Sequence, residues 1–186
     1  MYEEKAEKRK KEIKEWVMSI AIMLVVVFVV RTFMFGTVLV KGSSMWPALA
    51  HNDFVFINKI EYFIGNPNVG DIVVCEYDKG VEEEKIVKRI IGIPGDVIDL
   101  KENENYEYIV LVNSIEIDEF YLAEAMTQPG NIDYPFTVPE GCYFVMGDNR
   151  NSSNDSRSRV IGAISKDKIY GKVFLRVYPF DSIDVF

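Results

Sequence analysis

The chain has 186 residues, of which 48% are apolar and 13% aromatic, enough to bury a core and too apolar for a disordered chain. Its net charge is −8, and −10 beyond residue 35, where 14 basic residues face 24 acidic ones, a balance that weighs against a nucleic-acid partner. With one histidine, His51, and two cysteines, Cys75 and Cys142, the chain cannot form a zinc site from His and Cys ligands alone.

The N-terminal segment predicts a membrane anchor. Residues 3–15 are densely charged, whereas Trp16 to Val30 carry no charge. The 19 residues from Val17 to Phe35 contain one charge, Arg31, which can reach the headgroups, and as a helix they would extend about 28 Å, close to the thickness of a bilayer core. A buried core helix or a cleaved secretory signal is the alternative, but the bulky residues 31–36 are poor signal-cleavage residues. We therefore expect an uncleaved transmembrane helix over 16–35.

The distribution of basic residues predicts the orientation of this anchor. Six basic residues precede the span and only Arg31 and Lys41 follow its apolar part; the six are Lys5, Lys8, Arg9, Lys10, Lys11 and Lys14. Because basic residues concentrate on the cytoplasmic side, residues 1–15 are expected in the cytoplasm. Residues 36–186 would then form an extracytoplasmic domain of a single-pass protein of the cytoplasmic membrane.

Beyond the anchor the chain is rich in short β-like segments bounded by Gly, Pro, Asn and Asp, which predicts a mainly β domain with antiparallel sheets. Asn113-Ser114 is typical of a hairpin turn, and the acidic, aromatic stretch of about 102–138 indicates a small inserted β subdomain. A turn at Ser165–Lys168 is the one helical candidate. The predicted strands are 37–41, 53–58, 71–77, 85–91, 96–101, 106–112, 142–146 and 172–178.

Two segments carry candidate chemistry. Ser43 and Ser44 lie between Gly42 and Pro47, directly after the strand that leaves the predicted anchor, although a serine in such a turn is most often structural. In the strand 85–91, alternation places Lys88 on one face with two isoleucines. A lysine on an apolar face favours the neutral amine and can act as a general base. The alternative is that Lys88 has no catalytic role and either reaches solvent from an edge strand or pairs with one of Glu82, Glu83 or Glu84.

Four segments, in a fixed order after the apolar N-terminal run, carry a specific resemblance. They are GSSMWPAL (42–49), GDIVV (70–74), KRIIGIPGD (88–96) and GDNRNSSNDSR (147–157). Over most of residues 10–178 the sequence resembles the bacterial type I signal peptidases, membrane-bound serine proteases that remove signal peptides from exported proteins. The resemblance implies the signal-peptidase type of β-sheet catalytic domain.

The resemblance also implies residue roles. Ser44 is the expected nucleophile of an acyl-enzyme mechanism and Lys88 its general base, oriented by a hydrogen bond from Ser153. The backbone N–H of Ser44 is one expected oxyanion donor, and the second is open, because some relatives carry a serine where this chain has Gly42; Ser43 is a candidate. Ala48 and Cys142 also depart from the family pattern. The residues expected to brace the site, or simply to form strand-end ion pairs, are Arg89, Asp148, Asp155 and Arg157.

The expected partners are signal peptides of secretory pre-proteins and the lipid bilayer, with no metal and no organic cofactor. The resemblance implies shallow apolar pockets for small residues, and Val38, Val40 and Ile86 are candidate walls for an extended substrate. Four large apolar side chains near the end of the anchor are expected either to pack in the core or to enter the membrane interface. They are Phe33, Phe35, Met45 and Trp46.

Other interpretations remain open. They are a non-proteolytic membrane-anchored assembly factor of the pilus type, a self-cleaving repressor, a Ser–His pair between Ser44 and His51, and a disulfide between Cys75 and Cys142 in place of two free thiols.

Overall fold

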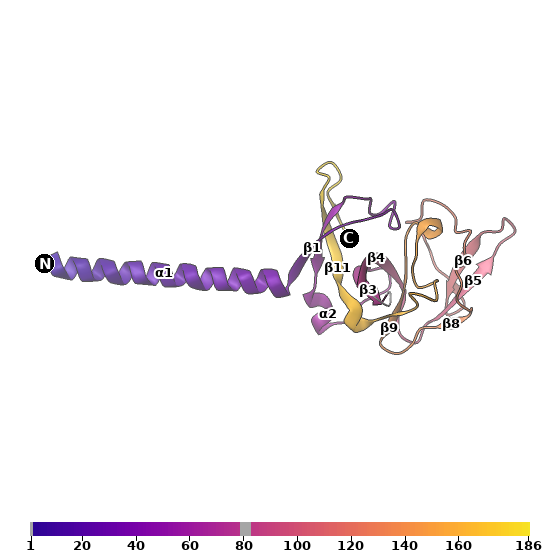
Figure 1. Cartoon of the computed structure of the whole chain (residues 1–186), viewed down its shortest axis with the longest axis horizontal. Coiled ribbons are helices and arrows are strands. Elements are labelled where there is room, and N and C mark those ends of the chain that lie inside the picture. Colours follow the sequence, from indigo (N-terminus) through magenta and orange to yellow (C-terminus); the bar gives the residue numbers. More distant parts are fainter. Residues whose placement is uncertain (1, 79–82) are drawn as a thin grey trace.

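The computed structural model describes the backbone of residues 2–78 and 83–186, and the side chains of these residues other than 2–6, 8, 29–33, 78, 83 and 84. A long helix, α1 (Tyr2–Phe33), extends from one end of a β-rich domain that contains the rest of the described chain (Figure 1). The two ends of the chain are therefore far apart, with the C-terminus on the domain and the N-terminus at the free end of α1.

The helix α1 differs from the predicted anchor. It runs without a break through the charged segment 3–15, and Phe35, predicted as the end of the span, already belongs to strand β1 (Phe35–Leu39). In the described part of the chain, no helix is long and apolar enough to cross a membrane. The predicted role of Arg31 lies outside the described side chains, as do those of Lys5, Lys8 and Phe33.

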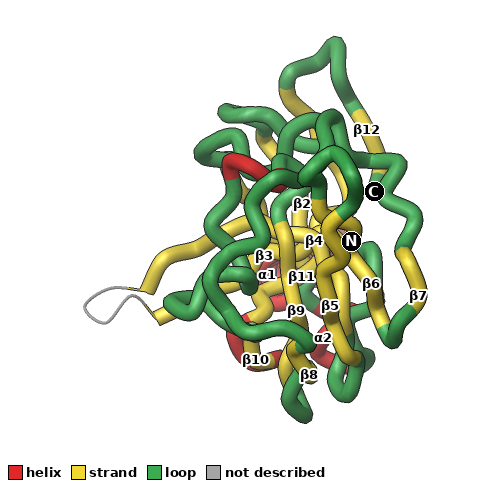
Figure 2. Tube along the Cα trace, turned by 90° about the vertical axis from the view of Figure 1, so that its right-hand side faces the viewer, coloured by secondary structure: helices red, strands yellow, loops and turns green. Residues whose placement is uncertain are grey.

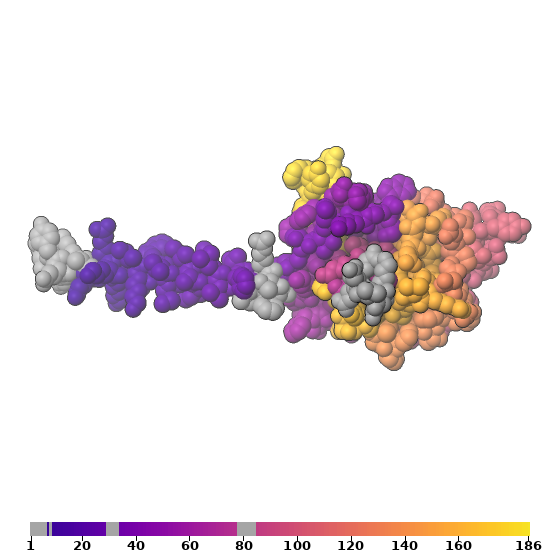
Figure 3. Space-filling model, viewed as in Figure 1, coloured from indigo at the N-terminus to yellow at the C-terminus, as the bar shows by residue number. Residues whose placement is uncertain are grey.

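The described apolar side chains of α1 do not form part of the domain core. Trp16 is 72% exposed and Phe28 is 68% exposed, and the large apolar side chains between them are also exposed. The space-filling view shows α1 standing clear of the domain along most of its length (Figure 3).

The main sheet has eight strands, and all of its pairs are antiparallel. The order is β1-β2-β11-β3-β4-β9-β10, with β12 paired to β11. In β2 buried residues alternate with half-buried ones, because one face packs on the core, whereas residues 72–77 of β3 and 143–146 of β9 are buried throughout, so both faces of these strands are covered. The bounds of the strands after β1 are β2 Phe54–Asn58, β3 Ile72–Asp78, β4 Glu83–Gly92, β9 Cys142–Met146, β10 Ile164–Ser165, β11 Ile169–Tyr178 and β12 Asp184–Val185.

A second antiparallel sheet has the order β7-β6-β5-β8, with β5 Val97–Glu102, β6 Tyr108–Val112, β7 Ile115–Glu116 and β8 Phe136–Thr137. Asn113 and Ser114 connect β6 to β7 with φ of 54° and 67°, the backbone of a two-residue hairpin turn. The predicted hairpin is therefore confirmed. This sheet begins earlier than the stretch 102–138, whose status as an inserted subdomain stays a prediction.

The described helices of the domain are single turns: α2 (Ile60–Ile64) and the 3₁₀ turns η1 (Arg150–Ser152) and η2 (Lys166–Lys168). The side chain of Asn58 accepts hydrogen bonds from the backbone N–H groups of Ile60 and Glu61, which explains why α2 begins there. The tube view shows strands and loops making up nearly all of the domain (Figure 2). All eight predicted strands and the predicted turn near 165–168 are present.

Three clusters of buried side chains hold the domain together. One lies among β3, β4 and β9 and includes Cys75 and Ile90. A second, which includes Met45 and Leu49, anchors the loop after β1. The third joins the second sheet to β9 and includes Ile98 and Phe144. The second sheet is thus packed directly against a strand of the main sheet.

Candidate active site

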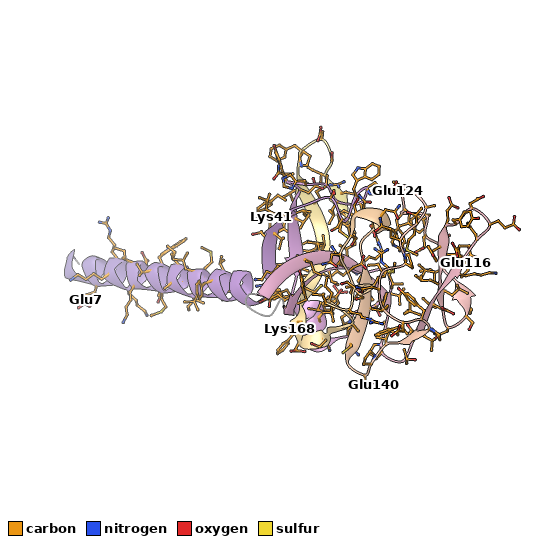
Figure 4. All side chains as sticks on the ribbon, turned by 45° about the vertical axis from the view of Figure 1, so that its right-hand side comes forward. Glu7, Lys41, Glu116, Glu124, Glu140 and Lys168 are labelled. Atoms are coloured by element: carbon orange, nitrogen blue, oxygen red, sulfur yellow. The ribbon has the colours of Figure 1, made fainter. Side chains whose placement is uncertain are left out.

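Ser44 lies in a tight loop that follows β1. Gly42 has a φ of 89°, which a side chain would disfavour, and the backbone N–H of Trp46 donates to the carbonyl of Ser43. The buried side chains of Met45 and Leu49 then fix the loop on the core. Figure 4 labels Lys41, which begins this loop on the side nearer α1.

Lys88 comes from β4, 44 residues later in the chain, and its amine meets the hydroxyl of Ser44. Its Nζ lies 2.7 Å from the Oγ of Ser44 and donates to the carbonyl of Val87 at 2.9 Å. Lys88 is only 3% exposed, and burial holds the pKa of its amine below the ordinary value for lysine, against the opposing effect of the Asp155 carboxylate. A neutral amine at this distance from a hydroxyl can take its proton.

The strand pattern explains why the amine of Lys88 is shielded from water. Lys88 is opposite Val73 in the pairing of β3 and β4, and Val73 is fully buried. Ile90, on the same face as Lys88, is also fully buried. The placement of Lys88 on an apolar strand face agrees with the sequence prediction. The side chains of Glu83 and Glu84, offered as alternative partners, lie outside the described side chains, and Glu82 lies outside the described backbone.

Ser153 lies next to Gly147 and the carbonyl of Ser44, and among the described residues no hydrogen bond joins its hydroxyl to the amine of Lys88. Its Oγ is buried and makes no hydrogen bond of good geometry among the described residues, although it lies near enough to the Asp155 carboxylate to help hold the pKa of that carboxyl below its ordinary value. A Cβ built on Gly147 would collide with this hydroxyl, so Ser153 packs against the loop that follows β9. The orientation of the lysine amine by Ser153 stays a prediction.

Arg89 and Asp148 form a two-point ion pair. The Nε of Arg89 donates to Asp148 at 2.8 Å and its Nη2 at 2.6 Å, while its Nη1 donates to the carbonyl of Gly70. Since Arg89 and Lys88 point to opposite faces of β4, the pair braces the far side of the strand that carries the amine. It also ties β4 to the loop after β9.

Asp155 and Arg157 form a second, more deeply buried pair. The guanidinium donates to the carboxylate at 2.8 Å through both Nε and Nη2, and the carboxylate also accepts the backbone N–H of Gly147. Burial opposes ionisation of Asp155, but the hydrogen bonds and charge of Arg157 hold the pKa of the carboxyl below its ordinary value. Asp155 therefore stays charged and fixes the start of the 147–157 loop.

Sequence reasoning missed three residues of this neighbourhood. Arg150 is 1% exposed and its guanidinium pairs with the carboxylate of Glu119, which comes from the segment after β7. The ring of Tyr121, from the same segment, stacks on the guanidinium of Arg89 at 4.2 Å. Arg150 stands within the GDNR motif without an assigned role, whereas nothing local in the sequence marks Glu119 or Tyr121. These contacts join the chain around 119–121 to the site.

A groove of about 570 Å³ leads to Ser44 and Lys88. One wall is β1 and the following residues (37–41), and the other is the first half of β4 (85–88). Within the described residues, β1 pairs only with β2, and residues 85–88 pair only with β3. Both walls therefore present an unpaired strand edge to the groove. The candidate substrate walls Val38, Val40 and Ile86 are among the lining residues.

The remaining candidate groups take structural roles. The Nδ1 of His51 accepts the backbone N–H of Gly42 at 3.0 Å, so that nitrogen is engaged away from Ser44. Cys75 is a buried free thiol and Cys142 a partly buried one, which excludes the disulfide between them. Met45 is buried, whereas Trp46 is 49% exposed. In the part of the chain that the structure describes, no group of His, Cys, Asp and Glu side chains is arranged to hold a metal ion.

Residues 13–178 match the sequence pattern of the family described as signal peptidase, peptidase S26. The chain belongs to this family. The membership makes the chain a peptidase, and the matched range contains the four motif segments.

Curated relatives of the S26 family match nearly the whole chain. A protein named signal peptidase I P, from Bacillus subtilis subsp. natto, is 38% identical over 97% of each chain. Signal peptidase IB from Staphylococcus aureus is 36% identical over 92% of each. The solved structure of a signal peptidase I from Enterococcus faecalis is 29% identical, covers 57% of this chain and 95% of its own, and has a TM-score of 0.46. The names of the two curated relatives support neither the assembly factor nor the self-cleaving repressor.

Proposed function

We propose that the protein is a signal peptidase I, an endopeptidase that removes signal peptides from exported pre-proteins, with Ser44 as nucleophile and Lys88 as general base. The observation that carries the proposal is the 2.7 Å separation of a buried amine and the hydroxyl of Ser44. Burial keeps that amine available as a base, which an exposed lysine near neutral pH is not. The family membership of the chain supports the same activity.

The proposed reaction needs only proton transfers and a water. Lys88 takes the proton of Ser44 as its oxygen attacks the carbonyl at the cleavage site, and the resulting ammonium protonates the departing amine. The acyl-enzyme on Ser44 is then hydrolysed by a water that the neutral amine of Lys88 activates. The backbone N–H of Ser44 donates to the tetrahedral oxyanion, a contribution of about 3 kcal/mol per donor. Ser43 is the candidate for the second donor.

The groove supports an extended peptide as substrate. An extended chain between β1 and β4 could form main-chain hydrogen bonds to both unpaired edges, since such bonds read any sequence. Alternate side chains of that peptide would then face the apolar residues Val38 and Ile86, and short side chains fit such shallow walls best. This is the arrangement expected of an enzyme that accepts many pre-proteins with small residues before the cut.

We also propose that lipid covers the apolar side chains of α1. The large apolar side chains from Trp16 to Phe28 are exposed. In a monomer in water they would form an apolar surface patch of unusual size. Residues 1–15 would lie in the cytoplasm and the domain outside it, as the basic residues predict. Alkaline extraction of membranes and protease protection of intact cells test this. Release of the protein by alkali, or a domain protected from external protease, would contradict it.

Cleavage of a secretory precursor by the full-length protein tests the enzymatic proposal. Ser44→Ala and Lys88→Ala should each abolish cleavage while the circular dichroism spectrum stays unchanged. Lys101→Ala is a matched control, because Lys101 is also a strand lysine but is exposed on β5. Cleavage by Lys88→Ala at the wild-type rate, or loss of cleavage only in His51→Ala, would overturn the assignment.

A further inference from the structure

The loop after β9 holds the nucleophile through one residue with no assigned role. We propose that Asn149 is a positioning residue that aligns the backbone N–H of Ser44 for the oxyanion. The inference deepens the proposed function and rests on it. It comes from the contacts of Asn149 with the two carbonyl groups that flank the α-carbon of Ser44.

Asn149 contacts the nucleophile loop from both sides. Its backbone N–H donates to the carbonyl of Ser44 at 2.9 Å, and its side-chain Nδ2 donates to the carbonyl of Ser43 at 3.2 Å. The carbonyl of Ser43 also accepts the backbone N–H of Trp46 at 3.1 Å. The peptide unit before Ser44 is thus held by one bond from within the loop and by one from Asn149, 106 residues away in sequence.

These bonds control the direction of the proposed oxyanion donor. The carbonyl of Ser43 and the N–H of Ser44 belong to one peptide unit, which is planar and trans. Fixing the direction of the carbonyl therefore fixes the direction of the N–H, which points the opposite way. Among the described residues, no acceptor takes the N–H of Ser44, so it is available to a substrate.

The carbonyl of Ser43 sets the orientation of the Asn149 amide. Its Nδ2 must face the carbonyl of Ser43, because the amide oxygen would meet that carbonyl lone pair to lone pair. This orientation leaves Oδ1 with no hydrogen-bond partner among the described residues.

The loop that carries Asn149 is itself rigidly anchored. The carboxylate of Asp155 accepts the N–H of Gly147, and the Nε of Arg150 donates to the carbonyl of Gly147. Both of these side chains are buried and charged. The bonds from Asn149 thus connect the nucleophile to a fixed support rather than to a mobile loop, which is what accurate alignment of a donor requires.

The experiment compares Asn149→Ala and Asn149→Asp with wild type in the full-length protein. Neither variant can donate from its side chain to the carbonyl of Ser43, apart from a protonated Asp. We expect kcat to fall by about 10- to 100-fold with KM within about twofold, because misalignment of a donor acts on the transition state. A peptide aldehyde, whose adduct places an oxyanion at this N–H, should lose affinity by a similar factor, whereas the matched peptide alcohol should not.

Asn151→Ala is the matched control. Asn151 lies two residues further along the same loop, and its side chain bonds to Ala125, Glu124 and Thr127 rather than to the nucleophile loop. It should lose stability without the selective loss of aldehyde affinity. A kcat of Asn149→Ala within about threefold of wild type would overturn the inference. So would equal losses in Asn151→Ala, or a parallel loss of alcohol affinity.

Different results would contradict the proposed function and the proposed role of Asn149. If wild type does not cleave precursor, or if Ser44→Ala still cleaves it, the proposed function is wrong. If wild type is active and Ser44→Ala is inactive, but the ratio of aldehyde to alcohol affinity is unchanged in Asn149→Ala, only the role of Asn149 is wrong.

Discussion

Gly147 lies against the backbone of Ser44 with no room for a side chain between them. A Cβ added to Gly147 would fall well inside van der Waals contact with the carbonyl oxygen of Ser44 and with the hydroxyl of Ser153. Because the first of these is a backbone atom, it cannot move without moving the nucleophile. We expect Gly147→Ala to lower kcat/KM at least about 100-fold in precursor cleavage, since a shift of about 1 Å at the reacting atoms is enough for such a loss.

Gly141→Ala provides the control for this substitution. A Cβ at Gly141 meets nothing within 4 Å, but its φ of 71° makes alanine unfavourable by about 1 to 2 kcal/mol. It should lower stability and leave kcat/KM of the folded protein unchanged. If Gly147→Ala and Gly141→Ala lost activity equally, steric displacement of Ser44 would not be the reason.

Lys88→Met should abolish activity and raise stability at neutral pH. Burial lowers the pKa of Lys88 in the folded protein, so the unfolded chain binds a proton more readily between that pKa and the ordinary value near 10.5. Stability of wild type therefore rises with pH through this window, and below it the full cost of burying the ammonium is present. Methionine removes that cost.

Chemical denaturation of the Lys88→Met variant and wild type across pH measures the difference. The gain in free energy of unfolding should be largest at low pH and should shrink as pH rises toward 10.5. In wild type, cleavage should increase as pH rises through the lowered pKa. A stability difference that is flat with pH would mean that the amine is not desolvated.

Glu119→Gln should destabilise the domain by about 3 kcal/mol. It leaves the buried guanidinium of Arg150 without its carboxylate, and an uncompensated buried charge is costly. Asp133→Asn is the matched control, because the Arg159–Asp133 pair is exposed and such pairs contribute little. Urea midpoints of the two variants should differ clearly. Similar midpoints would show that the Arg150 pair is not energetically important.

Cys75 should resist alkylation in the folded protein. Burial raises the pKa of its thiol to about 12, so the reactive thiolate is scarce near pH 8. Iodoacetamide followed by peptide mass analysis should show Cys142 modified first, because it is only partly buried. Both should react after denaturation. Equal labelling of Cys75 in the native protein would indicate that its strand opens readily.

Local patterns predicted the strands and the buried lysine well. The alternation in 85–91 places Lys88 among isoleucines, and the structure buries it there, because the period of a strand is fixed by backbone geometry. The hairpin at Asn113-Ser114 was predictable for the same reason, since its turn chemistry is local. The distance between Ser44 and Lys88 was not predictable from spacing, and only the family resemblance suggested it.

Long-range contacts account for most of what the sequence could not predict. Glu119 reaches Arg150 across 31 residues, and no periodicity or motif marks such a partner. The hydrogen bond from the side chain of Asn149 to the carbonyl of Ser43 depends on how two loops pack, so the motif sequence alone does not predict it. The bounds of helix α1 differ from the predicted bounds of the anchor for another reason. A charged segment with high helix propensity extends the same helix, so composition alone did not locate its ends.

Strand β4 presents Lys88 and Arg89 as consecutive residues, one directed to Ser44 and the other to Asp148. A slip of one position that brought Arg89 opposite Val73 would exchange an ammonium for a guanidinium beside the hydroxyl, and a guanidinium cannot give up its proton. A chain that collapsed with this misalignment could bury much the same surface and still be inert. Catalytic activity would then show whether β4 is aligned correctly with β3. Spectroscopy of secondary structure would not detect this error.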